Sequence, residues 1–208
     1  MKLISHRGNN NHKYKENTKE ALLETLKADY IDGVELDIRL TKDNKYVIVH
    51  NTSYVVFGLV RKFISSITLK EAKKDGLNSL EEFLDGVNTN KIIILDVKKE
   101  IGNCDYDVKE LIALLKKYNK LNLWICSFCY EIVNKLKKER KHTVGLLISD
   151  IINKNKDIKR FDFVSLSRNS YNDIKTNKVK MVWTINKKEH LKNNYEYIIT
   201  DKAHLLYV

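Results

Sequence analysis

Gly33-Val34-Glu35-Leu36-Asp37-Ile38-Arg39-Leu40 is the stretch of this 208-residue chain that decides its fold. Its aliphatic and β-branched residues are typical of a buried strand, in which side chains two positions apart share a face. Glu35 and Asp37 are therefore expected on one face, with apolar residues on the other. Two like charges on a half-buried strand repel each other, and a bound divalent cation relieves that cost. The alternative is a solvated edge strand, the commoner origin of an isolated Glu-x-Asp pair.

Strand-like and helix-like segments alternate along the rest of the chain. Further strands are expected at residues 1–5, 91–98, 122–127, 144–148, 162–166, 179–185 and 197–200. Helical spacing of apolar residues occurs at 16–27, 69–74, 79–84, 107–118, 130–140 and 187–192. Buried strands that alternate with helices favour a parallel sheet, and eight of them favour a (β/α)8 TIM barrel. An open doubly wound sheet is the alternative.

The length of the chain limits what this barrel can contain. About 250 residues is typical of the fold, so several helices are expected to be short or missing, and the crossover at 151–159 is expected to be irregular. Asp43-Asn44 is a turn signal, which predicts a β-hairpin arm near residues 46–50. No change in composition divides the sequence, so residues 1–208 are expected to form one domain.

The charge balance favours anionic partners. The chain has 38 Lys and Arg against 27 Asp and Glu, a net charge of +11. Phosphates, an acidic membrane surface or nucleic acid would suit this charge. The lysines are spread along helix-like segments such as 135–141, which favours solvated faces over one binding patch. Because no aromatic-interleaved basic run occurs, nucleic acid is not expected as a partner, whereas peripheral contact with an anionic membrane stays open.

The three cysteines, Cys104, Cys126 and Cys129, have no disulfide-framework spacing and predict a reducing compartment. Cys126 and Cys129 form a C-x-x-C pair, for which small core residues are favoured over a redox site because a buried strand leads into it. The first residues lack an apolar signal region, and no apolar run approaches membrane-spanning length. A cytoplasmic location is therefore expected.

Polar residues interrupt the apolar strands at one end. They are His6 and Arg7 after the first strand, Glu35 and Asp37 in the second, Asp96 and Lys98 in the third, and Ser127 at the end of the fourth. Barrel enzymes gather their chemistry at the carboxyl ends of the strands. Random placement would rarely put every polar residue there, so these side chains are expected to converge.

Their convergence would form a reaction centre. Glu35, Asp37 and Asp96 offer the oxygen ligands that Mg²⁺ or Ca²⁺ prefers. His6 and His50 can serve as acid and base at neutral pH.

Two cations complete the predicted site. Arg7 and Lys98 would neutralise phosphate oxygens and the charge that develops on them during reaction. Metal ligands, paired histidines and cations together indicate in-line attack at a phosphodiester. Each residue type alone has an ordinary structural explanation, so the prediction depends on the combination.

The order of these motifs resembles the glycerophosphodiester phosphodiesterase family. The matching motifs are His6-Arg7-Gly8, Glu16-Asn17-Thr18, Gly33-Val34-Glu35-Leu36-Asp37, Thr41-Lys42-Asp43 and Val47-Ile48-Val49-His50, followed by residues 80–84, 95–98, 127–128, 182–186 and 198–201. The resemblance spans nearly the whole chain, and the first 50 residues carry its most specific part.

The resemblance implies a phospholipase-C-like TIM barrel that uses a divalent metal to hydrolyse glycerophosphodiesters to glycerol 3-phosphate and an alcohol. The implied roles are acid and base for His6 and His50, metal ligands for Glu35, Asp37 and Asp96, phosphate contacts for Arg7 and Lys98, and the substrate mouth for Trp183 and Ser127. A core position is the alternative for Trp183. The implied partner is a small glycerophosphodiester or a lysophospholipid headgroup.

Three departures from the family pattern affect this reading. Asn51 stands where the family usually has Asp, so His50 lacks a charged neighbour, and Asp96 is one methylene shorter than the usual Glu. The insertion after His50 is reduced to residues 52–66, and a more open mouth would suit lipid headgroups. A phospholipase-D-like lyase that forms a cyclic phosphate, and an inactive phosphate- or lipid-binding module, remain alternatives.

Overall fold

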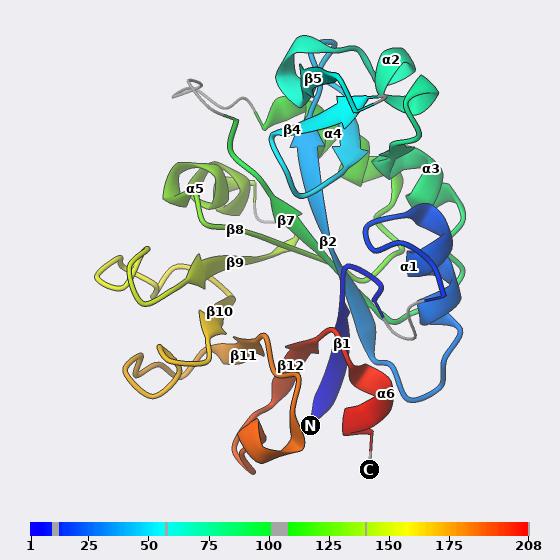
Figure 1. The fold of residues 1–208 in the computed structure, drawn as a ribbon. Helices are drawn as coiled ribbons and strands as arrows, with labels where there is room; N and C mark the ends of the chain where they lie inside the picture. Colours follow the sequence, from blue (N-terminus) through cyan, green and yellow to red (C-terminus); the bar gives the residue numbers. More distant parts are fainter. Residues whose placement is uncertain (10–12, 57, 101–107, 140, 208) are drawn as a thin grey trace.

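Parallel strands close into a barrel in the computed structural model, which describes residues 1–9, 13–56, 58–100, 108–139 and 141–207 (Figure 1). The barrel strands are β1 (Lys2–His6), β2 (Gly33–Leu40), β7 (Ile92–Val97), β8 (Leu123–Ser127), β9 (Thr143–Ile148), β10 (Phe163–Ser167), β11 (Val179–Trp183) and β12 (Tyr197–Thr200). β1 pairs in parallel with both β12 and β2, which closes the sheet. The TIM barrel is therefore confirmed, and the open doubly wound sheet is excluded.

Helices cover the first half of the barrel better than the second. They are α1 (Lys19–Leu26), α3 (Leu80–Asp85), α4 (Lys109–Lys117), α5 (Tyr130–Lys138) and the short α6 (Ala203–Leu206), with a 3-10 turn η2 (Lys188–His190) before β12. The described connections after β9 and β10 contain turns and bends but no helix. The expectation of short or missing helices is confirmed. Asp107 and Arg140, where two helices were expected to begin and end, lie outside the described residues.

An insertion follows β2. β3 (Tyr46–Ile48) pairs antiparallel with β2 through a turn in which Asn44 has φ 57°, and β6 (Asn78–Ser79) pairs with β3. The described residues of 52–66 include a separate antiparallel pair of β4 (Ser53–Val56) and β5 (Val60–Phe63), followed by the 3-10 turn η1 (Ile64–Ser66). Helix α2 (Leu69–Lys74) then leads back to the barrel. The segment expected as a reduced loop is therefore an ordered hairpin that projects from the barrel (Figure 1).

Two apolar layers hold β2 in place. Val34, Leu36 and Ile38 belong to the core between barrel and helices, while the barrel interior is filled by residues such as Ile94 and Met181. The face of β2 that carries Glu35 and Asp37 is therefore the inner one. At Gly33 a Cβ atom would lie 2.3 Å from the carbonyl oxygen of Ile92, so only glycine permits the close approach of β2 and β7 beneath the acids.

The cysteines do not form a disulfide within the described residues. Cys126 is buried in the barrel interior and Cys129 is half-buried; both are free thiols. Cys104 lies outside the described residues. Among the described residues, no helix has the length and apolar character needed to cross a membrane.

Candidate active site

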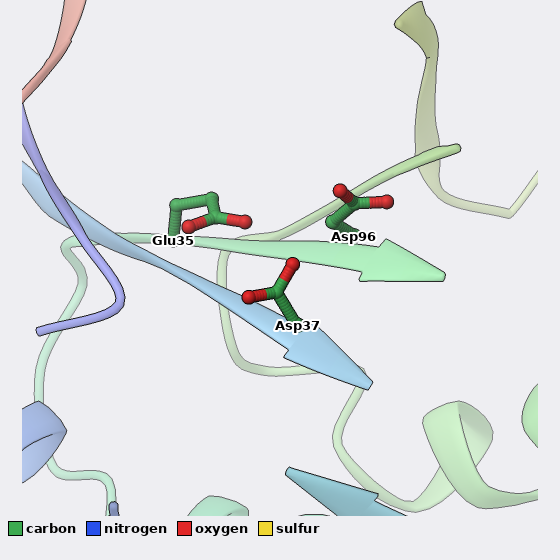
Figure 2. Close-up of side chains that lie close together, drawn as sticks. All are labelled: Glu35, Asp37 and Asp96. Carbon is green, nitrogen blue, oxygen red and sulfur yellow. The ribbon is translucent and has the colours of Figure 1, made fainter. Parts of the chain in front are cut away.

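Three carboxylates meet near the carboxyl ends of β2 and β7 (Figure 2). Asp37 and Asp96 are direct neighbours in the parallel register, and Glu35 lies two residues before Asp37 on the same face. One oxygen from each side chain lies within 4.8 Å of the others. All three residues are buried. The expected convergence of the acids is therefore present in the fold.

Burial makes negative charge on these three carboxylates unfavourable. Burial, reinforced by the negative charge of Asp37, raises the pKa of Glu35 to about 8. Burial also raises the pKa of Asp96, and the positive charge of Lys98 offsets this in part. The Oδ1 atom of Asp96 is buried and has no hydrogen-bond partner among the described residues. The cluster thus presents an unsatisfied oxygen and a carboxyl group that resists ionisation.

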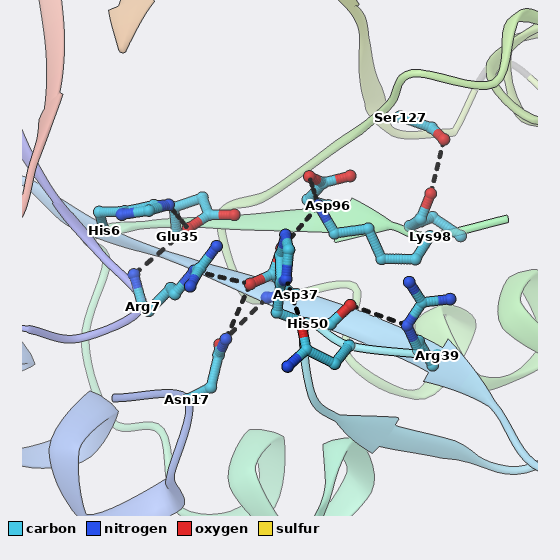
Figure 3. Close-up of polar contacts among 12 residues, drawn as sticks. His6, Arg7, Asn17, Glu35, Asp37, Arg39, His50, Asp96, Lys98 and Ser127 are labelled. Atoms are coloured by element: carbon cyan, nitrogen blue, oxygen red, sulfur yellow. Dashed lines mark hydrogen bonds and ion pairs between the residues drawn. The ribbon is translucent and has the colours of Figure 1, made fainter. Parts of the chain in front are cut away.

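Lys98 and Arg7 lie against the acids (Figure 3). The Nζ atom of Lys98 is 2.8 Å from Oδ1 of Asp37 and 2.5 Å from Oδ2 of Asp96. The Nε atom of Arg7 forms a 2.9 Å ion pair with Oδ2 of Asp37, and Arg7 also pairs with Glu16 at 2.8 Å. Burial raises the pKa of Asp37, but Lys98 and Arg7 outweigh it and the net shift is downward. Asp37 is therefore the acid that stays ionised most easily.

The side chain of His6 is held by the carboxylate of Asp201, which directly follows β12. Its Nδ1 donates to Oδ1 of Asp201 at 2.6 Å, and its Nε2 faces Oε2 of Glu35 at 3.8 Å. Asn186 fixes Asp201 in turn, donating to its Oδ2 at 2.7 Å and accepting from its backbone N–H at 2.9 Å. Burial lowers the pKa of His6, but the hydrogen bond to Asp201 and the charge of Glu35 outweigh it and raise the pKa overall.

His50 follows β3 and approaches the cluster from the insertion. Its Nδ1 lies 3.0 Å from Oδ1 of Asn51, and this contact leaves Nε2 as the ring nitrogen free to exchange protons. The backbone carbonyl of His50 accepts a 2.9 Å hydrogen bond from Nε of Arg39. Arg39 also forms a buried 2.9 Å ion pair with Glu100. The backbone position of His50 therefore depends on Arg39, and the orientation of its ring depends on Asn51.

Several supporting residues were not predicted as site residues. Asn17 donates to Oδ2 of Asp37 at 2.7 Å and accepts from the backbone N–H of Asp37 at 3.2 Å. Asn17 and Asp201 both stand inside motifs quoted for the family resemblance, which is the signal that could have identified them. Arg39 lies two residues after Asp37 on the same strand, so the sequence also predicts that its side chain points into the barrel.

A pocket of about 240 Å³ opens over the acids. His6, His50 and the three carboxylates line it together with Trp183 and Phe128, whose rings meet edge to face at 5.8 Å. The indole Nε1 of Trp183 is buried without a hydrogen-bond partner among the described residues, so it is free to donate to a ligand. Trp183 thus lines the pocket and also packs against the apolar barrel interior, and its role at a substrate mouth stays a prediction.

Ser127 occupies a different place. It is buried, donates to the carbonyl of Val97 at 2.5 Å and accepts from the backbone N–H of Cys129 at 3.0 Å, and it is absent from the described lining of the pocket. Its hydroxyl joins β8 to β7. Ser127 thus supports the strand ends structurally, because both of its hydrogen-bonding roles are already taken.

A second, larger groove of about 690 Å³ adjoins this pocket. The two spaces share Arg7 and His50, and the groove continues between the β1–α1 connection and the β4–β5 hairpin. Fold and site together define a (β/α)8-barrel protein with a buried acidic centre, flanked by two histidines, at the carboxyl ends of its strands.

Comparisons with known proteins agree with this class. Residues 6–203 match the model of the glycerophosphoryl diester phosphodiesterase family. The chain belongs to this family of phosphodiester-cleaving enzymes, as its sequence motifs indicated.

Relatives and solved structures show the same similarity. The chain is 27% identical to a glycerophosphodiester phosphodiesterase of Caldanaerobacter subterraneus, covering 98% of this chain and 95% of that protein. It is 31% identical to an uncharacterised Mycoplasma genitalium protein over 58% of this chain and 56% of that one. The crystal structure of a Thermotoga maritima glycerophosphodiester phosphodiesterase matches with a TM-score of 0.77 at 26% identity, covering 98% and 95% of the two chains. An Oleispira antarctica phosphodiesterase, solved with sn-glycerol-3-phosphate, has a TM-score of 0.83 at 19% identity, covering 99% and 95%.

Proposed function

We propose that this protein is a divalent-metal-dependent phosphodiesterase that hydrolyses glycerophosphodiesters to glycerol 3-phosphate and an alcohol by histidine acid–base catalysis. The observation that carries the proposal is the buried trio of carboxylates with oxygens within 4.8 Å, flanked by His6 and His50 in one pocket. The family membership and the product bound to the Oleispira antarctica phosphodiesterase support the substrate class.

The residues present fit a divalent cation. Glu35, Asp37 and Asp96 would hold Mg²⁺ or Ca²⁺, since both cations take carboxylate oxygens. The unpartnered Oδ1 of Asp96 and the raised pKa of Glu35 are what a site prepared for a cation would show. When bound, the metal would polarise the phosphoryl oxygens and stabilise their charge.

The chain's own residues supply the proton transfers. Asp201 fixes His6 with its Nδ1–H engaged, so Nε2 is the atom that points into the pocket. The raised pKa of His6 suits it to protonate the leaving alkoxide, and His50 is then the base that takes the proton from the attacking hydroxyl. Arg7, which lines the pocket, would neutralise phosphate oxygens, and Lys98 would add its charge from its position against Asp37 and Asp96. The attacking hydroxyl belongs either to water or to the neighbouring glycerol carbon, and the second route gives a cyclic phosphate.

The substrate is a small glycerophosphodiester or the headgroup of a lysophospholipid. Every acid, base and ligand position holds a competent residue, which favours an active enzyme over an inactive binding module. The cytoplasmic location stays a prediction.

Phosphorus NMR tests the proposal directly. Purified protein with glycerophosphocholine and Mg²⁺ or Ca²⁺ is expected to produce a glycerol 3-phosphate signal that EDTA abolishes. His6→Ala and Glu35→Gln should show no signal, and a cyclic phosphate resonance in the wild type would identify the lyase route. Absence of turnover with either metal, on both glycerophosphocholine and lysophosphatidylcholine, would contradict the proposal.

Asp201→Asn is expected to lower kcat roughly 10²-fold, the share that positioned acid–base catalysis typically contributes. Asn can still accept the hydrogen bond from Nδ1 of His6 but carries no negative charge, so loss of the carboxylate removes the main influence that raises the pKa of His6. The basic limb of the pH–kcat profile should therefore move to lower pH while KM changes little.

The matched control for that change is Asp173→Asn, which removes an exposed carboxylate paired with Lys154. A profile identical to that of the wild type in Asp201→Asn would show that Asp201 does not position His6. A purely structural role would lower the amount of folded enzyme without moving the profile.

A further inference from the structure

Exposed apolar side chains are concentrated at one end of the molecule. The large hydrophobic residues with high exposure are Tyr14, Val55, Leu59, Val60, Phe63, Ile151 and Ile152 in the segments after β1, β2 and β9, and Met1, Leu205 and Tyr207 near the termini, where Tyr207 packs on Tyr30. Isolated exposed hydrophobic residues are normal, but a group on one face marks an interaction site. In the described part of the chain, seven of these ten residues therefore lie in segments that leave the mouth of the barrel.

The β4–β5 hairpin holds the largest share of this surface. Leu59, at the turn, is 88% exposed, and Val55 and Val60 are each more than half exposed. The hairpin forms a two-stranded sheet of its own, and its inward residue Tyr54 packs against the small core around Ile64. Among the described residues, Val55, Leu59 and Val60 do not belong to that core. Figure 1 places the hairpin at the top of the molecule and both termini at the bottom.

A second apolar site lies in the connection after β9. Ile151 is 92% exposed and Ile152 is 46% exposed. This connection leaves the barrel at the same end as the insertion that carries the hairpin, because both follow the carboxyl ends of parallel strands. The barrel mouth with the catalytic pocket therefore lies on the side from which both apolar segments project.

Positive charge accompanies both apolar segments. Residues 52–66 contain Arg61 and Lys62 and no acid, and the connection 149–162 contains four Lys and Arg against three Asp. Two of these lysines also have acidic partners, Lys62 in Asp75 and Lys154 in Asp173. Apolar side chains flanked by cations are what an anionic lipid surface binds, through insertion and electrostatic attraction respectively. The groove beside the hairpin, lined by Val55 and Arg61, opens onto His50 and Arg7. A path thus leads from the apolar hairpin to the reacting groups.

We propose that the β4–β5 hairpin and the connection after β9 form a lipid-binding face that docks the barrel mouth on anionic lipid aggregates. Leu59 and Ile151 insert among acyl chains while the flanking cations contact lipid phosphates. The enzyme then takes the headgroups of lysophospholipids from the aggregate surface through the groove. The choice of substrate rests on the proposed phosphodiesterase function, whereas the docking itself does not.

Vesicle sedimentation tests the docking. The wild type is expected to bind vesicles of phosphatidylcholine with phosphatidylglycerol, and to bind pure phosphatidylcholine less, with binding that decreases as salt rises. Leu59→Ser and Ile151→Ser should each lower the partition coefficient about tenfold, because each removes an inserted aliphatic side chain. Leu205→Ser removes a 49% exposed leucine near the other end and is the matched control, expected to bind as the wild type does.

Enzyme assays separate the two ideas. Leu59→Ser should retain wild-type turnover of soluble glycerophosphocholine and lose several-fold in kcat/KM on lysophosphatidylcholine mixed with anionic lipid. Equal vesicle binding by Leu59→Ser, Leu205→Ser and the wild type would overturn the lipid-binding face, as would no binding by the wild type. Absence of turnover on both substrates would instead contradict the proposed phosphodiesterase function and leave the sedimentation result to decide the docking.

Discussion

Glu35→Gln is expected to remove almost all turnover and, at the same time, to stabilise the metal-free protein at alkaline pH. The loss of one metal-ligating carboxylate should lower kcat/KM roughly 10³-fold, which corresponds to about 4 kcal/mol of transition-state stabilisation. The gain in stability arises because Glu35 is buried beside Asp37 and Asp96, where a negative charge is unfavourable. Glutamine keeps the shape of the side chain without that charge.

The pH dependence follows from the pKa of Glu35. In the metal-free fold this pKa is raised from 4.5 to about 8, mainly by burial and then by the charge of Asp37. A group with a raised pKa stabilises the fold below its unfolded pKa, and that contribution is lost as pH rises through the folded value. The metal-free wild type should therefore lose on the order of 3–5 kcal/mol between about pH 5 and pH 9 through this group. Glu35→Gln should lack this loss.

Urea unfolding in EDTA at pH 6 and pH 9 measures the effect, and repetition with Mg²⁺ or Ca²⁺ measures its reversal. A divalent cation should stabilise the wild type at pH 9 and have little effect on Glu35→Gln. The control is Glu24→Gln on α1, where the carboxylate pairs with Lys27 at 2.9 Å outside the cluster. Equal activity in Glu35→Gln and the wild type would refute the assignment of Glu35 as a ligand.

The acidic cluster was readable from the sequence because it depends on local rules. Alternation along a strand placed Glu35 and Asp37 on one face, and the parallel register of β2 and β7 brought Asp96 beside them. The barrel itself could be predicted because eight apolar strands were recognisable one by one. Helical spacing likewise identified α1, where Thr18 caps the first turn by accepting from the N–H of Ala21.

The contacts that orient the histidines could not be read in this way. His6 and Asp201 are 195 positions apart, and they meet only because β12 pairs with β1 when the barrel closes. Asn17 reaches Asp37 from a connection in which its own φ is 55°, a conformation that spacing rules do not predict. Contacts that arise from closure of the barrel, or from an irregular backbone conformation, leave no periodic pattern in the sequence. Ser127 shows the converse, since its position at a strand end suggested a mouth residue while its hydroxyl bridges two strands.

Arg39→Met is expected to cause the largest loss of stability of any change near the site. Arg39 and Glu100 form a buried ion pair in which the side chains are only 8% and 6% exposed, so removal of the cation leaves Glu100 buried without its ion-pair partner. Such losses cost roughly 3–5 kcal/mol. Burial already raises the pKa of Glu100, with Arg39 opposing it. Without Arg39 the pKa should rise further, so the destabilisation should be greatest at alkaline pH and smaller where Glu100 is protonated.

The double variant Arg39→Met with Glu100→Gln separates stability from catalysis. Replacing both partners removes the unpaired charge, so urea unfolding at pH 8 should recover most of the lost free energy. Turnover should stay low, because the carbonyl of His50 still lacks the 2.9 Å hydrogen bond from Nε of Arg39 that holds the backbone of His50 in place. A reduction in kcat of about tenfold or more with KM nearly unchanged is expected from a misplaced proton-transfer group. Full activity in a stable double variant would show that Arg39 serves the fold alone, and that the backbone of His50 is held by β3 without it.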